Sequence, residues 1–313
     1  MVSTGLAGLI VASVLLAAAV GATCVALARR GGSGTAAAAC LAGAIVLSLA
    51  LLNVYQYLRA AAAGPAGGAD WGTTRVVLAD EAVEGTSPTT ARSEPFLTDP
   101  AEQGVVDRYA ELFYAKQGTW QQRQWLGVRA MQNPNDAWMH QEIIVETRPD
   151  FVIEAGTASG GGALFWATVL REVNPNGKVI TIDIQDLSQA AREQALWKER
   201  VEFVHGSSTD PAIVATLAER VRGRRVLVIL DSDHRYPHVL AELKAYAPLV
   251  QPGGFIVVQD SNVNGHPVVP TFGPGPMEAI EAFLAADDRF ASDRSRESLL
   301  HTMHPRGYLR RVK

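Results

Sequence analysis

The second half of this 313-residue chain predicts an α/β fold built on a doubly wound, Rossmann-like sheet. Three observations carry the prediction. After Pro149, short apolar runs alternate with helical periodicities. The run 225–230 is almost wholly apolar, which is typical of a central parallel strand covered by helices on both faces. The first run ends in a Gly-rich turn, as strands of doubly wound sheets do where they lead into a ligand-binding loop.

The elements follow in a regular order. The expected strands are 151–154, 178–183, 201–205, 225–230 and 252–258, and the expected helices are 163–173, 188–199, 211–221, 237–249 and 276–286. Upstream, apolar residues recur at helical spacing from Val105 to Phe113 and predict a further helix. An aromatic-rich loop with Trp120 and Trp125 follows it. Strands that alternate with helices at this spacing indicate one layered domain over 105–313.

The N-terminal region has a different composition. Gly5–Ala28 and Thr35–Leu52 are apolar and uncharged, and each is long enough to cross a bilayer as a helix. We therefore expect residues 1–60 to form a membrane anchor of one or two transmembrane helices. Residues 61–104 are rich in Ala, Gly, Ser and Pro and are expected to be a flexible linker. The alternative, a secretory signal peptide, calls for a positively charged start that this chain lacks.

Charge and cysteine content exclude several classes of function. The formal net charge is −4, with no long basic run, so no nucleic-acid partner is expected. Cys24 and Cys40 both lie in the apolar N-terminal region. The domain over 105–313 therefore has no disulfide framework, no Cys-ligated zinc site and no cysteine nucleophile.

The Gly-rich turn Glu154-Ala-Gly-Thr-Ala-Ser-Gly160 predicts a cofactor loop. Glycine allows a tight turn and close approach of the backbone to a ligand, and the amides at the start of the following helix are donors. The G-x-x-x-G spacing, with an acid two residues before the first glycine, differs from the G-x-G-x-x-G of NAD-binding folds. Asp183 ends the next strand, where its carboxylate can accept both ribose hydroxyls of a nucleoside. The expected cofactor contacts in this region are Glu154, Gly156, Thr157, Gly160 and Asp183.

Further polar residues follow the third strand. Ser207 and Ser208 are expected near the adenine end of such a cofactor, where they supply hydroxyl and backbone contacts. His140 is expected to line the cofactor pocket from the helix before the first strand. His238 is expected on an ordinary helix surface, and His304 is expected to be structural.

Two acidic clusters follow the fourth and fifth strands. Asp231 and His234 lie in the first, and Gln259 and Asp260 begin the second. Adjacent parallel strands end side by side, so Asp231 and Asp260 can share one ion, and oxygen ligands suit magnesium. Such an ion lowers the pKa of a substrate hydroxyl, and His234 can take the proton as general base. The alternative, helix-capping acids beside a surface histidine, explains the convergence of polar groups less well.

With these residues identified, the chain resembles the cephalosporin hydroxylase family over about residues 107–312. That family has a class I methyltransferase fold and includes macrolide-sugar and rhamnosyl O-methyltransferases. The resemblance rests on several ordered motifs: Gln141-Glu-Ile-Ile144, Arg148-Pro-Asp150, the loop 154–162, Ile182-Asp183-Ile184, Leu230-Asp-Ser-Asp-His234, Gly253-Gly254 and His304-Pro-Arg-Gly-Tyr-Leu-Arg310.

The resemblance implies S-adenosylmethionine as cofactor, with contacts at Glu154, Gly156 and Asp183. It also implies magnesium at Asp231 and Asp260 and a catalytic base at His234. The family's metal site has a Glu-Asp pair where this chain has Gln259-Asp260. An amide oxygen can still ligate, so Gln259 is expected in the metal site, but the missing negative charge predicts weaker metal binding.

The expected function is a membrane-tethered, S-adenosylmethionine-dependent O-methyltransferase, assisted by magnesium. It would act on a hydroxyl of a sugar, a glycolipid or a natural-product glycoside, alone or as a homo-oligomer. The alternative is a catalytically weakened, cofactor-binding membrane scaffold. Because the cofactor is cytosolic, we expect the catalytic domain on the cytoplasmic side of the cell membrane, although Arg29 and Arg30 favour the opposite orientation. A hydroxylase would need a 2-His-1-carboxylate iron site, and no such motif stands out.

Overall fold

The structure, a computed structural model, describes residues 91–313. The expected membrane anchor and most of the expected linker lie outside these residues. Among the residues it describes, no helix has the length and apolar character needed to cross a bilayer. The helix expected near Val105 begins earlier than predicted, at Pro100, because Asp99 caps it by accepting a hydrogen bond from the amide of Ala101.

Within residues 91–313 the core is a seven-stranded sheet with the order β5-β4-β3-β6-β7-β9-β8. Its strands are β3 (Phe151–Ala155), β4 (Lys178–Asp183), β5 (Val201–His205), β6 (Val226–Leu230), β7 (Phe255–Val258), β8 (Phe290–Ser292) and β9 (Tyr308–Arg311). Strands β3 to β7 are parallel, as expected, which confirms the α/β Rossmann-like fold. The sheet is mixed, however, because β9 runs antiparallel to both β7 and β8.

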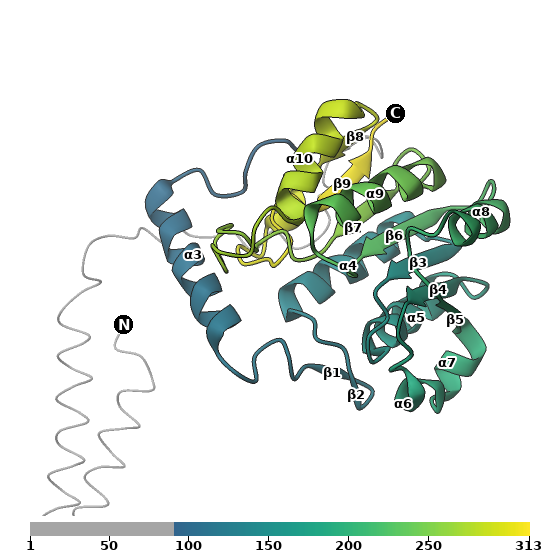
Figure 1. Cartoon of the computed structure of the whole chain (residues 1–313). Coiled ribbons are helices and arrows are strands. Elements are labelled where there is room, and N and C mark those ends of the chain that lie inside the picture. The colour runs from purple at the N-terminus through teal and green to yellow at the C-terminus, as the bar shows by residue number, and fades with distance from the viewer. Residues whose placement is uncertain (1–90) are drawn as a thin grey trace, which may run out of the picture. The chain divides into compact units, whose positions relative to one another are not determined.

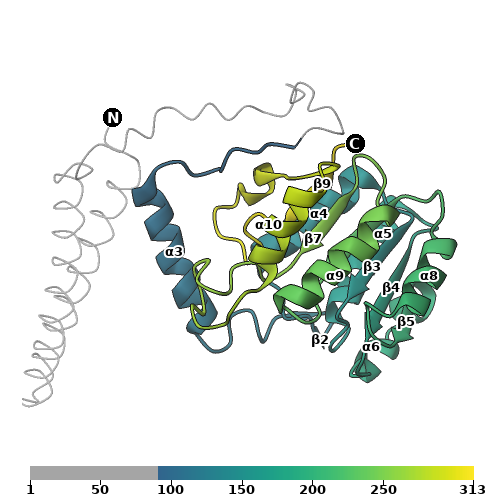
Figure 2. The ribbon, with the colours of Figure 1, turned by 45° about the horizontal axis from the view of Figure 1, so that its top comes forward.

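Helices cover both faces of the sheet (Figures 1 and 2). The longer helices are α3 (Pro100–Ala115), α4 (Pro134–Thr147), α5 (Gly161–Val173), α8 (Pro211–Arg220), α9 (Tyr236–Tyr246) and α10 (Pro276–Ala286). Shorter elements are β1 (Gln124–Trp125), β2 (Val128–Arg129), α6 (Gln189–Arg192), α7 (Ala195–Arg200) and the 3₁₀ turns Ala247–Leu249 and Arg294–Glu297. Helices α8, α9 and α10 pack on one face, and α4, α5 and α7 pack on the other.

The strand residues divide between these two cores by the two-residue period of a strand. In β3, Val152 packs toward α4 and α5, whereas Ile153 and Ala155 pack toward the opposite face. The helix expected over 188–199 is broken into α6 and α7, because Gln194 between them is extended. The break lets Trp197 pack against Gly160 of the predicted cofactor loop.

Candidate active site

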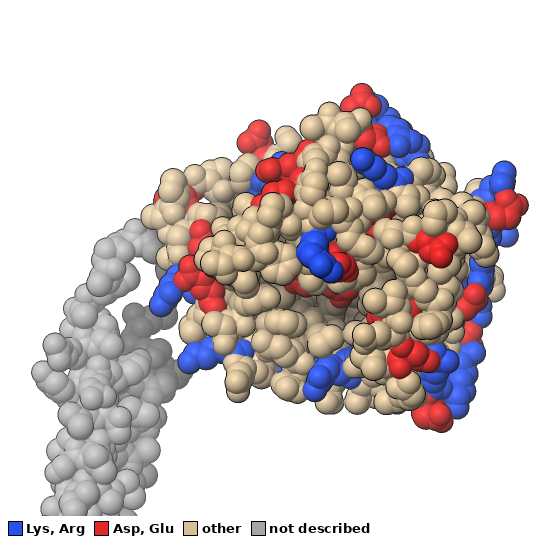
Figure 3. Space-filling model, viewed as in Figure 1, with Lys and Arg blue, Asp and Glu red and all other residues tan. Residues whose placement is uncertain are grey.

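A cavity of about 750 Å³ opens at the carboxyl ends of the parallel strands. It brings together most of the predicted site residues: Gly156, Asp183, Ser207, Ser208, Asp231, His234, Gln259 and Asp260. Tyr114 and Trp120, from the end of α3 and the loop after it, also line the wall. Figure 3 shows acidic side chains in the hollow near the centre of this face of the molecule. The ligand-binding end of the sheet therefore lies where the strand order predicts.

Gly156 allows the cofactor loop to pass directly against the end of β6. Its φ is +96°, and a Cβ at this position would lie 1.9 Å from the carbonyl oxygen of Asp231. Its amide donates to the carbonyl of Ile182, and the amide of Asp231 donates to the carbonyl of Ala155. No side chain fits here, so glycine is what brings the loop and the acidic cluster into contact.

Glu154, Thr157 and Gly160 are not part of the cavity wall. The carboxylate of Glu154 is buried and accepts hydrogen bonds from Trp166 Nε1 at 3.0 Å and Thr181 Oγ1 at 2.6 Å. Burial raises the pKa of Glu154 to about 7. The hydroxyls of Thr157 and Thr181 lie 2.6 Å apart. These residues support the loop from behind, and a direct contact with cofactor stays a prediction for them.

Asp183 faces the cavity at the end of β4, as predicted. Its Oδ2 accepts the amide of Ala158 at 2.9 Å, and its Oδ1 accepts the amide of Gln185 at the same distance. The two amides fix the orientation of the carboxylate and leave lone pairs on both oxygens. These lone pairs can accept the two hydroxyls of a ribose.

Asp231, His234 and Asp260 converge in the cavity, and one ligand atom from each lies within 4.8 Å of the others. His234 Nε2 is 3.1 Å from Asp260 Oδ2 and 3.9 Å from Asp231 Oδ1. Burial and the charge of Asp260 raise the pKa of Asp231 well above its usual range. Two carboxylates that repel each other in this way form a donor set that a hard cation would stabilise.

The same charges act on His234. Burial lowers the pKa of its imidazole, but the carboxylates of Asp260 and Asp231 outweigh burial and raise that pKa to about 9. Without a cation, His234 is therefore protonated at neutral pH and cannot accept a proton. Neutralisation of the two acids would move its pKa back toward the range of a general base.

Gln259 is buried beside this cluster, and its amide oxygen is already engaged. Gln132 Nε2 donates to Gln259 Oε1 at 3.1 Å, while Gln259 Nε2 and Gln132 Oε1 have no hydrogen-bond partner. An amide oxygen has two lone pairs, so one remains for a cation. The pairing with Gln132 was not anticipated from the sequence.

The backbone of Asp260 is held in a left-handed conformation with φ +54°. Its amide donates to His304 Nδ1 at 3.1 Å, and His304 Nε2 lies 3.7 Å from the buried carboxylate of Asp136. His304 was expected to be structural, and it is also part of the cavity wall. The expectation that His140 lines the pocket is wrong, because His140 is fully buried and stacks on the far side of the His304 ring. Its position on α4 turns the ring into the core.

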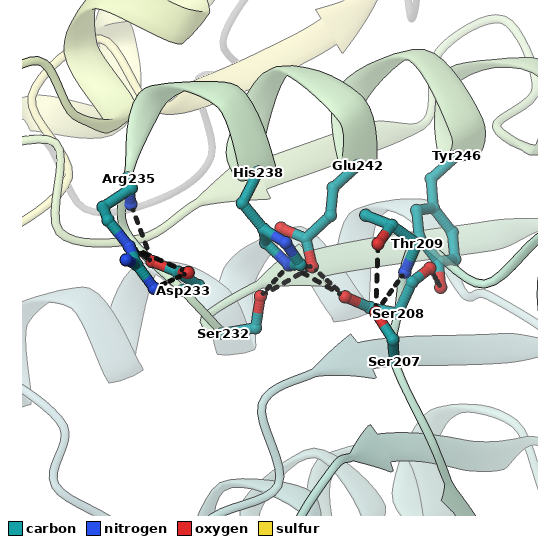
Figure 4. Close-up of polar contacts among 9 residues, drawn as sticks. All are labelled: Ser207, Ser208, Thr209, Ser232, Asp233, Arg235, His238, Glu242 and Tyr246. Carbon is teal, nitrogen blue, oxygen red and sulfur yellow. Dashed lines mark hydrogen bonds and ion pairs between the residues drawn. The ribbon is translucent and has the colours of Figure 1, made fainter.

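His238 is not on an ordinary helix surface. It lines the cavity and contacts Ser208, Ser232 and the buried carboxylate of Glu242, one helical turn further along α9 (Figure 4). Sequence reasoning missed Glu242, and it named Ser232 only as part of the motif 230–234. The i, i+4 spacing of His238 and Glu242 was the available signal, but their serine partners come from other loops.

Comparisons with known proteins identify the family of this chain. The family model for rhamnosyl O-methyltransferase/CmcI matches residues 117–312. The rhamnosyl O-methyltransferase of Mycobacterium tuberculosis is 41% identical over 192 residues, which is 60% of this chain and 76% of that protein. The corresponding protein of Mycobacterium leprae is 40% identical over 187 residues, covering 57% of this chain and 77% of the relative.

Two similarities are more distant. An 8-demethyl-8-alpha-L-rhamnosyl tetracenomycin-C 2'-O-methyltransferase of Streptomyces olivaceus is 34% identical over 104 residues, which is 33% of this chain and 25% of that protein. The solved apo structure of CmcI-N160 superposes with a TM-score of 0.47 at 20% identity, over 72% of this chain and 90% of that chain.

Proposed function

The chain belongs to the rhamnosyl O-methyltransferase/CmcI family and is an S-adenosylmethionine-dependent O-methyltransferase, and we propose that it methylates a sugar hydroxyl with the help of magnesium. The acceptor sugar would be carried on a glycolipid or a natural-product aglycone. The observation that supports this best is the convergence of Asp231, His234 and Asp260 in a cavity whose wall also includes Asp183.

Each residue has a chemical task in this proposal. Asp183 accepts the ribose hydroxyls of the cofactor, and the backbone at Gly156 lies close to the cofactor. Asp231 and Asp260, with the amide oxygen of Gln259, would hold magnesium, which would supply a Lewis acid that lowers the pKa of the acceptor hydroxyl. His234 would take the hydroxyl proton as the oxygen attacks the methyl group, while the bond from the methyl group to the sulfonium sulfur breaks and S-adenosylhomocysteine leaves.

Alignment supplies much of the rate acceleration. The methyl group of the cofactor is already reactive, so the enzyme's main task is to hold the acceptor oxygen in line with it. Gly156 permits the cofactor loop to lie close to Asp231, and this proximity supports the proposal that cofactor and magnesium bind side by side.

The membrane tether belongs to the proposal as well. It rests on the apolar stretches Gly5–Ala28 and Thr35–Leu52, which lie outside the described residues. A tether at the cytoplasmic face of the cell membrane would keep the enzyme near a lipid-linked acceptor.

Cofactor binding provides the first test. Isothermal titration of the full-length protein with S-adenosylhomocysteine should show binding that Asp183→Ala weakens at least about tenfold, the loss expected for a charge-assisted hydrogen bond. The control variant Glu193→Gln, which changes an exposed acid ten residues after Asp183, should leave the affinity unchanged. Failure of the wild-type protein to bind would overturn the proposed function.

A second candidate is a cofactor-binding scaffold without turnover, which the uncharged Gln259 and its bond to Gln132 favour. Mass spectrometry of rhamnosides incubated with the protein and S-adenosylmethionine separates the two. A product heavier by one CH₂ that disappears with a chelator supports the metal-assisted enzyme. Cofactor binding with no product from any glycoside supports the scaffold.

A further inference from the structure

A buried carboxylate lies in the wall of the cavity, away from the acidic cluster. Glu242 on α9 is 1% exposed, and its Oε1 lies 2.5 Å from Ser208 Oγ and 2.7 Å from Ser232 Oγ (Figure 4). A carboxylate has no proton to give, so both hydroxyls donate to it. Each hydroxyl has a single proton, and Glu242 therefore takes the donor capacity of both serines.

His238 completes this arrangement from the same helix. Its Nε2 lies 3.2 Å from Ser208 Oγ, 3.1 Å from Ser232 Oγ and 3.3 Å from Glu242 Oε1. Because the serine protons point to Glu242, the imidazole must donate. The hydrogen bond with Glu242 and its negative charge raise the pKa of His238, which keeps that N–H in place.

The direction of these hydrogen bonds decides what the wall offers a ligand. Ser208 and Ser232 both line the cavity, and with their protons committed they present lone pairs to it. The hydroxyl of Tyr246 donates to the carbonyl of Ser208 at 2.8 Å, which anchors the loop after β5. The serine wall, meaning Ser208 and Ser232, is thus a rigid set of acceptors.

The serine wall lies where the base of a nucleoside would reach. Asp183 at the end of β4 is paired in register with His205 at the end of β5, and Ser208 follows three residues later. Neighbouring strands are about 4.8 Å apart. A nucleoside with its ribose on Asp183 can therefore extend its base across the end of β5 to Ser208. Ser232 follows β6 and lies beside Ser208, because both serines donate to Glu242 Oε1.

We propose that Glu242 is a positioning residue that makes the serine wall accept the exocyclic amine of adenine, and so makes the site select 6-amino over 6-oxo purines. The inference rests on the proposed use of an adenosyl cofactor. A 6-oxo purine places its carbonyl oxygen against the serine oxygens. Both are then acceptors, so no hydrogen bond forms between them. One buried hydrogen bond lost in this way corresponds to a preference of about 10- to 100-fold.

Glutamine at position 242 would remove the constraint. Its amide has donors as well as an acceptor, so the serine hydroxyls can rotate and direct a proton toward the cavity. The variant Glu242→Gln keeps the size of the side chain. It should therefore lose selectivity more than it loses affinity.

The test compares binding of S-adenosylhomocysteine and S-inosylhomocysteine by isothermal titration of the full-length protein. The wild type should prefer the adenosyl ligand by about 10- to 100-fold, and Glu242→Gln should reduce the preference to within about threefold. Ser232→Ala should also reduce the preference, because it removes one of the two acceptors of the serine wall; the side chain of Ser232 is only half-buried. Glu219→Gln, an exposed acid on α8, should preserve it.

The outcomes are distinct. Equal affinity of the wild type for both ligands, or a parallel loss of both affinities in Glu242→Gln with an unchanged ratio, overturns the inference while the methyltransferase function stands. Absence of binding to either ligand by the wild type overturns the proposed function itself. If Glu242→Gln melts before the titration, Ser232→Ala decides, and an unchanged ratio in that variant overturns the inference.

Discussion

Replacing Gly156 by alanine should damage both the fold and the metal site, and the structure allows the magnitude to be worked out. A residue with a side chain at φ +96° costs about 1–2 kcal/mol. The new Cβ, 1.9 Å from the carbonyl oxygen of Asp231, must also push β6 away, and overpacking of this kind costs about 1–3 kcal/mol. The expected loss of stability is therefore about 2–5 kcal/mol.

The chain offers a matched control. Gly223 also has a positive φ, +71°, but nothing lies within 4 Å of the position that its Cβ would take. Gly223→Ala should therefore cost only the conformational part, about 1–2 kcal/mol. The difference between the two variants isolates the overlap with Asp231.

Thermal melting of the full-length protein measures the difference. For a domain of this size, 1 kcal/mol shifts the melting temperature by about 2–4 °C. Gly156→Ala should melt well below Gly223→Ala, and it should require more magnesium for half-maximal activity because the backbone of Asp231 has moved. Equal melting temperatures for the two variants would refute the claim that the loop packs against β6 as described.

Three further predictions concern polar side chains in or beside the site. His234→Gln should lower kcat by about 10²- to 10⁴-fold without changing cofactor affinity. Without metal, the wild-type protein should lose stability as pH rises from about 6.5 to 9, because the pKa of His234, raised to about 9, stabilises the folded state only while the imidazole is protonated. His234→Gln should flatten this fall. The stability of Glu154→Gln relative to wild type should be greater at pH 8 than at pH 5, as measured by thermal melting. The reason is that the pKa of Glu154, raised to about 7, makes the wild-type protein lose stability as pH rises from about 4.5 through 7. His304→Leu should weaken magnesium binding about 10- to 100-fold. His304→Asn should retain most of the affinity, because its amide oxygen can accept a hydrogen bond from the amide of Asp260. Equal affinities of these two variants in a magnesium titration would contradict the positioning role of His304.

The parallel part of the fold was predictable because local patterns determine it. Strands β4 and β5 have the bounds expected from the sequence, since their apolar residues sit between clear turn signals. Asp231 and Asp260 were expected together for a topological reason, because β6 and β7 are neighbours and end at one edge. That argument needs no knowledge of side-chain packing.

The missed features depend on contacts that no local pattern reveals. Strand β9 contains two arginines and forms by pairing with β7, more than fifty residues earlier. The contact of His304 with the amide of Asp260 joins two loops, and so does the hydrogen bond from Ser208 to Glu242. Such pairings appear only when the strands have been placed side by side.

The buried position of Glu154, in contrast, could have been predicted from the sequence. Because side chains alternate along a strand, Glu154 shares a face with Val152, which packs toward α5. Its carboxylate consequently points to Trp166 of that helix and away from the cavity. The two-residue period was sufficient to assign Glu154 to the interior.

The position of β9 has a consequence for how the protein matures during translation. Domains generally fold as units, and the sheet of this one is incomplete until its last strand is available. Asp260 is held by His304, and the strand that follows His304 must insert between β7 and β8. We therefore expect a nascent chain to become competent for methyl transfer only after residue 311 has left the ribosome.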